Sequence, residues 1–244
     1  MSDGFDLRSE LSRGLRGAAG VARFIRLFAA RYASPVAAGD GCTEEELLAA
    51  EARLGLPLPA PLRAVYALIG RRTDLTRTQD RLLSPDQVDV DDSGEVLVFR
   101  VENQCVAEWG VPLPAVTEPD PPVVFRPDAA DRAGRTWRPF LDRVSAACVE
   151  MVLSEWMLSG GELTDDRELD GATVAALEER FHRLPIPDHP SWAQPGDGPT
   201  RWFEGYGAIL REDPGTWLWV RAPSADGLSA VRRALPGQWR TDEG

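Results

Sequence analysis

The sequence predicts an α+β fold, in which a mixed or antiparallel sheet is flanked by helices. The first observation lies in residues 95–125, where two short apolar runs, Leu97–Val101 and Cys105–Trp109, enclose a polar triplet, a pattern typical of two strands joined by a short loop. A third apolar run, Val123–Phe125, follows two prolines. The second observation is that apolar residues recur at helical spacing on both sides of this stretch. In the first run one face is apolar and the other mixed, so we expect a sheet covered mainly on one side.

The N-terminal part, residues 1–40, is predicted to be a helical segment. Residues 5–33 contain leucines and phenylalanines at mostly helical spacing, interrupted by glycines, which indicates one helix or two. This segment carries more arginines than acids. A basic amphipathic helix can mark a membrane surface or a target-binding segment, but packing on the chain's own acidic body is the favoured interpretation.

Two helices are predicted next. Thr43 and Glu46 form a capping box at the start of the first helix, and Gly55 ends it. Its buried side is predicted to consist of three leucines, Leu47, Leu48 and Leu54. After a proline-rich break, the apolar residues of the second helix fall at i, i+3, i+4 and i+7, namely Leu62, Val65, Tyr66 and Ile69. The two helices are expected to form a compact hairpin.

The later elements follow from the same periodicities. Residues 128–134 are predicted to form a loop, and Pro139–Leu158 the longest apolar helix, with burial on more than one side. The C-terminal part then predicts a helix, two strands with a Pro-Gly turn between them and a last helix, at Thr173–Arg183, Trp202–Leu210, Trp217–Arg221 and Ala225–Leu235. The expected organisation is an N-terminal helical segment (1–40), a core (41–160) and a C-terminal strand-helix extension (161–244) that completes the same domain.

Composition narrows the classes of partner. The 244 residues carry a formal net charge of -12, and all 27 basic residues are arginine. An acidic protein repels phosphate backbones and favours basic protein surfaces, so nucleic acid is disfavoured as a partner. No apolar run approaches the roughly 18 residues of a membrane span, and no secretion signal is evident. We therefore expect a cytoplasmic protein that does not associate with a membrane.

The motifs for metal binding are incomplete. Asp89, Asp91, Ser93 and Gly94 imitate the front of a calcium loop, but Arg100 stands at the twelfth position, where a bidentate glutamate is required. The three cysteines are isolated in the sequence and predict neither a disulfide framework nor a zinc site: Cys42, Cys105 and Cys148. We predict no metal site and no cofactor.

The residues offer no local catalytic set either. Only two histidines exist, His182 and His189, and their proline-rich surroundings indicate surface positions. Asp165 and Asp166 could be an acid and base pair, but adjacent carboxylates usually form a solvated charge run. No catalytic residue is predicted. A hydrolase built from distant carboxylates and one of the histidines remains an alternative.

A series of short motifs, in a fixed order, resembles the SUKH superfamily of bacterial immunity proteins, relatives of the fungal Smi/Knr regulators of cell-wall synthesis. The matching residues are the TEEEL opening at Thr43–Leu47, the hairpin AEARLGLPLPAPLRAVYALIG at Ala50–Gly70, the segment Leu82–Pro85, VFRVENQCVAEWG at Val98–Gly110, DPPV at Asp120–Val123 and the late helix with Ser145 and Glu155. The resemblance covers residues 42–158, and the order of the motifs makes it specific.

This resemblance implies an α+β fold and a protein that binds and neutralises a cognate polymorphic toxin domain, such as a nuclease, without catalysis of its own. The alternative within the binding class is a regulatory adaptor like the fungal relatives. The resemblance also singles out Glu102, Asn103, Gln104, Trp109 and Asp120, which are interface residues or scaffold; scaffold is favoured, because such residues often satisfy buried polar groups.

The physical candidate for contact with a basic toxin is the acidic loop with Asp86, Asp89, Asp91 and Asp92. A solvated loop without a partner is the alternative. We expect the protein to be a monomer or a weak dimer.

Overall fold

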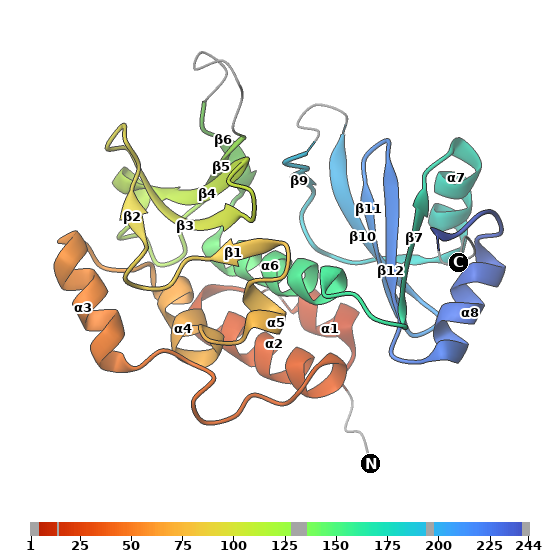
Figure 1. Ribbon diagram of the computed structural model, residues 1–244, viewed down its shortest axis with the longest axis horizontal. Coiled ribbons are helices and arrows are strands. Elements are labelled where there is room, and N and C mark those ends of the chain that lie inside the picture. The colour runs from red at the N-terminus through yellow and green to blue at the C-terminus, as the bar shows by residue number, and fades with distance from the viewer. Residues whose placement is uncertain (1–4, 14, 128–135, 194–197, 241–244) are drawn as a thin grey trace. The chain divides into compact units, whose positions relative to one another are not determined.

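The computed structural model describes residues 5–13, 15–127, 136–193 and 198–240. Over this part the chain is an α+β protein with two antiparallel sheets (Figure 1). It divides into two compact units, Met1–Leu158 and Ser159–Gly244. The predicted boundary at residue 160 lies close to this division. However, the C-terminal segment has a sheet and an apolar core of its own, where we expected it to complete the first domain.

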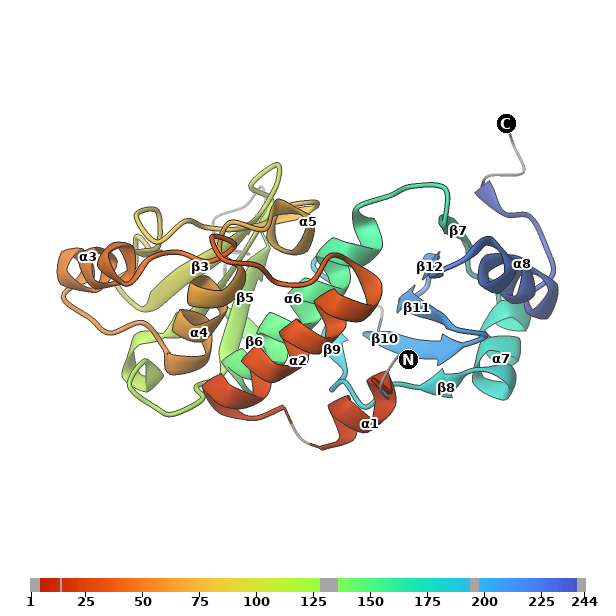
Figure 2. The same ribbon diagram turned by 90° about the horizontal axis from the view of Figure 1, so that it is seen from below.

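The first unit contains the helices α1 (Leu7–Ser12), α2 (Gly17–Tyr32), α3 (Glu44–Leu54), α4 (Ala60–Ile69), α5 (Thr73–Thr76) and α6 (Val144–Leu158), and the 3-10 helix η1 (Leu113–Ala115). The N-terminal segment packs on its own unit, as predicted: Phe24 and Phe28 of α2 are buried, and Phe28 meets Trp156 of α6 edge to face at 5.5 Å. Figure 2 shows α2 and α6 side by side.

Helix α3 begins and ends where its sequence predicts. Thr43 and Glu46 form the capping box, and Gly55 closes the helix in the left-handed conformation, with φ of 66°. Leu47 is buried, but Leu48 is 53% exposed, so the prediction for Leu48 was wrong. Each residue turns a helix by about 100°, and the buried side of α3 is narrow, consisting of Leu47 and Ala50, so Leu48 falls on the exposed side.

The sheet of the first unit has the strand order β1-β3-β4-β5-β6, and β2 also pairs with β3. Its strands are β1 (Asp80–Leu82), β2 (Asp89–Val90), β3 (Val96–Glu102), β4 (Ala107–Pro112), β5 (Val123–Pro127) and β6 (Arg138–Leu141). All seven residues of β3 are buried, so the expectation of a sheet covered mainly on one side was wrong for this strand. The mixed face, which carries Arg100, reaches acidic side chains of α6 and not solvent.

Helix α6 is the centre of the first unit. It starts at Val144, later than predicted, because residues 139–141 belong to strand β6. Burial on more than one side is confirmed, since every residue from Val144 to Met157 is buried. In Figure 1 it lies between the sheet and the N-terminal helices. The predicted loop at residues 128–134 lies outside the described residues.

The second unit contains β7 (Thr164–Glu168), α7 (Gly171–Arg180), β8 (His182–Arg183), β9 (His189–Pro190), β10 (Pro199–Gly205), β11 (Ala208–Asp213), β12 (Trp217–Arg221) and α8 (Ala225–Ala234). The strand order is β7-β12-β11-β10-β8, and β9 also pairs with β10. The single strand predicted at 202–210 is a hairpin that turns at Tyr206 and Gly207, both with positive φ. Leu177 of α7 and Val231 of α8 join the core formed with Phe203 and Leu210.

One prediction about polar residues in this unit was wrong. Asp165 and Asp166 are not a solvated charge run: they are buried in β7, where Asp165 pairs with Arg232 and Asp166 lies 3.5 Å from Arg240. A buried carboxylate requires such a partner, which the local sequence does not reveal.

Among the described residues of the whole chain, no helix is both long and apolar enough to cross a membrane.

Candidate functional site

Glu102 is part of the scaffold at the end of β3. Its side chain is buried, and its carboxylate accepts hydrogen bonds from the backbone N–H of Gln104 at 2.6 Å and from the Gln79 side chain at 3.0 Å. These bonds hold the turn that leads to β4, in which Cys105 has a positive φ of 62°. Asn103 and Gln104 themselves are exposed at the tip of this turn. Of the polar triplet, only these two side chains can reach a partner.

Trp109 is a core residue of β4. It is 2% exposed, lies under the guanidinium of Arg100 at 4.7 Å from the ring centre and meets Phe140 edge to face. The stacked cation and ring contribute to the packing between β3 and β4. A partner protein cannot contact Trp109 without opening the sheet.

Asp120 joins three segments of the first unit. Its carboxylate accepts hydrogen bonds from the backbone N–H of Gly17 at 2.8 Å and of Ser145 at 2.9 Å, and from the Ser145 hydroxyl at 2.6 Å. It therefore satisfies free amide groups at the first turns of α2 and α6 and complements the positive ends of both helix dipoles. Asp120 and Ser145 act as scaffold in this arrangement.

The sequence reasoning missed a buried ion cluster beneath the sheet. Arg100 donates to Glu150 and to Asp80, each at 2.7 Å, and lies 3.4 Å from Glu155. Glu155 also accepts hydrogen bonds from the backbone N–H groups of Thr78, Gln79 and Asp80. Burial raises the pKa of Glu155, and the opposing effects of Arg100 and of these N–H groups only partly offset it. The sequence does contain an indication of this cluster. The most apolar helix carries two glutamates, Glu150 and Glu155, and a buried carboxylate needs a partner.

The acidic loop is organised by Asp91. Its carboxylate is buried and accepts hydrogen bonds from the backbone N–H groups of Glu95 and Val96, each at 3.0 Å, and from the indole of Trp137 at 3.0 Å. Burial alone would raise the pKa of Asp91, but these bonds and one from Ser93 outweigh it and hold the pKa far below its usual range. Asp91 is thus a fixed anion inside the turn and is not available to a partner.

The other acids of this loop point outward. Asp86, Asp89 and Asp92 are exposed, and so is Glu95 at the end of the turn. Asp89 has a long ion pair with Arg53 at 3.7 Å. The exposed carboxylates of Asp92 and Glu95 therefore lie on a rigid turn between β2 and β3, because the backbone N–H groups of Glu95 and Val96 are hydrogen-bonded to Asp91.

An apolar hollow adjoins this turn. It has a volume of about 450 Å³ and begins at Gly94 and Glu95. The rest of its lining is almost wholly apolar and comes from β3, β4, η1, β5 and the residue before β6: Val96, Pro112, Leu113, Pro114, Val124 and Trp137. An apolar hollow with carboxylates on its rim matches the composition of a protein-binding hot spot.

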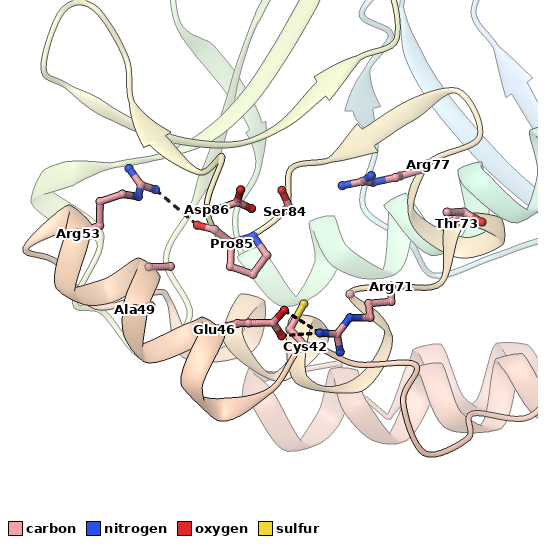
Figure 3. A pocket seen from close by; sticks show the side chains of 12 residues that line it. Cys42, Glu46, Ala49, Arg53, Arg71, Thr73, Arg77, Ser84, Pro85 and Asp86 are labelled. Atoms are coloured by element: carbon pink, nitrogen blue, oxygen red, sulfur yellow. Dashed lines mark hydrogen bonds and ion pairs between the residues drawn. The ribbon is translucent and has the colours of Figure 1, made fainter.

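A second hollow of about 650 Å³ lies between α3, the end of α4 and the turn at Ser84–Asp86 (Figure 3). We call it the arginine groove, because Arg53, Arg71 and Arg77 line it. Their carboxylate neighbours in the lining are Glu46 and Asp86, and Cys42 lies at its base. Burial raises the pKa of Cys42, so this thiol stays protonated at neutral pH.

The histidines lie in the second unit. His182 is exposed, as predicted, but His189 is buried, so the prediction for His189 was wrong. The indole N–H of Trp202 donates to Nε2 of His189 at 3.3 Å, and this pairing makes the buried position possible.

Within the described residues, no group of three or more His, Cys, Asp or Glu side chains is arranged to hold a metal ion.

Comparison of the chain with known protein families, with curated proteins and with solved structures finds no match.

Proposed function

We propose that this chain is an immunity-type protein that binds a basic toxin domain and neutralises it. The resemblance to the SUKH superfamily suggests the class, and one structural observation supports it most: a rigid acidic turn stands beside an apolar hollow. The docking face in this proposal is defined by Asp89 of β2, by Asp92 and Glu95 on the turn, and by Leu113 and Trp137 in the hollow.

The two parts of this face have different tasks. Carboxylates on the rim attract a basic partner and accelerate association, an effect that salt weakens. The hollow accepts an apolar side chain of the partner, and burial of that side chain slows dissociation. Because Asp91 already orders the turn, binding costs little conformational entropy there.

Rescue of growth tests the proposal. The chain is coexpressed with toxin domains encoded beside its gene, and rescue by the intact chain is expected. A double variant, Asp92→Arg with Glu95→Arg, should slow association about tenfold or more and make it less sensitive to salt. Leu113→Ser should instead mainly speed dissociation. Glu162→Arg with Glu179→Arg, the same change of charge at two exposed positions of the second unit, is the matched control and should behave like the intact chain.

Two results would contradict the proposal. Failure to rescue against every neighbouring toxin, together with stable copurification of a non-toxic protein, would favour the adaptor alternative. Rescue and tight binding that survive the double variant would place the contact elsewhere on the molecule.

A further inference from the structure

Arg77 differs from the other two arginines of the arginine groove. Arg71 is paired with both carboxylate oxygens of Glu46 at 2.7 Å, and Arg53 donates to the carbonyl oxygens of Val88 and Pro85. Arg77 is exposed and makes no side-chain hydrogen bond or ion pair with any residue that the structure describes. Figure 3 shows its guanidinium directed toward Ser84 along the upper wall of the groove.

Arg77 is the arginine of the groove that has no paired carboxylate among the residues that the structure describes. Arg71 is paired with Glu46, and Arg53 lies 3.7 Å from Asp89, which is not part of the lining. Both acids of the lining are ionised at neutral pH: a hydrogen bond from Ser84 holds the pKa of Asp86 below its usual range, and one from the Thr43 backbone does the same for Glu46. The protein as a whole is acidic, but salt screens distant charges over about 8 Å, so the guanidinium of Arg77, unpaired within the described residues, can still attract an anion locally.

The remaining lining suits a small ligand with an apolar part. Ala49, Ala50 and Pro85 offer apolar surface, and Thr73 and Ser84 offer hydroxyl groups. The volume of about 650 Å³ lies within the range that small-molecule sites occupy. Because Arg77 needs no rearrangement of an existing ion pair to bind an anion, it is the group best placed to do so.

We propose that the arginine groove binds a singly charged carboxylate attached to a small apolar group, with Arg77 as its main anchor. A planar guanidinium binds a carboxylate through two parallel hydrogen bonds. A doubly charged phosphate fits less well, since Glu46 and Asp86 repel the second charge. The carboxylate can belong to a free acid or to the C-terminus of a peptide. This site adjoins the docking face, since Arg53 of the groove lies 3.7 Å from Asp89, but it does not depend on a toxin partner.

Calorimetric titration of the full chain tests the site with four probes: hexanoate, an N-acetylated Ala-Leu dipeptide with a free carboxyl group, the same dipeptide as its amide, and inorganic phosphate. We expect saturable binding of at least one of the two carboxylates and weaker or no binding of the amide and of phosphate. Preference between hexanoate and the dipeptide acid identifies the source of the carboxylate.

Three variants locate the binding. Arg77→Gln should weaken carboxylate binding about tenfold or more, the loss expected for a charge-assisted pair. Asp86→Asn should strengthen it, because a nearby repulsive charge is gone. Arg26→Gln, the same loss of charge at an exposed position of α2 outside the groove, should leave it unchanged. The proposal is overturned if neither carboxylate binds, if the amide or phosphate binds as tightly, or if Arg77→Gln and Arg26→Gln have equal effects. Thermal unfolding verifies that each variant is folded.

Discussion

Arg100 of β3 and Glu150 of α6 form an ion pair of 2.7 Å in which both side chains are only 3% exposed. It ties the central strand to the central helix across 50 residues of sequence. Removal of one partner of a buried ion pair lowers the free energy of unfolding more than removal of one partner of a surface pair. The remaining partner would be an uncompensated charge in a medium of low dielectric constant.

Replacement of Arg100 by methionine should therefore destabilise the first unit strongly. Asp80, Glu150 and Glu155 would lose their common counter-charge, and the loss of one partner from a buried pair typically costs about 3–5 kcal/mol. The free energy of unfolding in urea measures the effect. Arg26→Met, at an exposed position of α2, is the control and should change stability by less than about 0.5 kcal/mol. An equal loss in both variants would contradict the central role of the cluster.

Asp91 should make stability depend on pH in the acid range. Its pKa is lower in the folded chain than in the unfolded chain, so its stabilisation is complete above the unfolded value of about 3.9 and is lost as the pH falls below it. Urea unfolding of the intact chain and of Asp91→Asn between pH 2 and pH 7 measures this. The stability difference between the two should shrink toward low pH, and a constant difference would contradict the assignment.

Asp120→Ala should lower stability because the starts of α2 and α6 each lose an acceptor. Loss of a helix cap costs about 0.5–2 kcal/mol, so we expect a decrease in this range for each helix. Glu118→Ala, at an exposed neighbouring position, is the matched control for urea unfolding. If Asp120 is scaffold, Asp120→Ala protein that remains folded will still bind its partner, whereas loss of binding in a folded variant would make Asp120 an interface residue.

The link between the two units should be the preferred site of proteolysis. Ser159, Gly160, Gly161 and Glu162 are exposed, and both glycines have positive φ. Exposed loops of small residues are readily cut, whereas residues 144–157 are buried in a helix. Limited digestion with proteinase K, followed by mass spectrometry, should give two resistant fragments that separate near residue 160. First cleavage within α6 or β7 would contradict the division.

Elements defined by local chemistry were predictable. The capping box and the left-handed glycine of α3 are contacts between residues close in sequence, and the apolar spacing of α4 directly reflects its buried face. The high burial of α6 could also be predicted, since it has too much apolar circumference to be covered on one side. In each case the information lies within one element.

The structural features that the sequence did not predict depend on partners that are distant in sequence. Arg100 is buried because Asp80, Glu150 and Glu155 surround it, and Asp165 is buried because Arg232 reaches it. The candidate site shows the same division: the acidic loop could be recognised, but the inward position of Asp91 depends on Trp137 and Arg126. The arginine groove has no sequence signature, because its three arginines come from separate elements.

The position of α2 has a consequence for shortened versions of the chain. Trp156 of α6 meets Phe28 edge to face and donates its indole N–H to the carbonyl oxygen of Tyr32, at the end of α2. A chain that starts at Gly41 would keep every strand, but it would lack α2 and expose the ring of Trp156 to water. Such a fragment should precipitate or self-associate during purification, although all the motifs that resemble the immunity proteins would still be present.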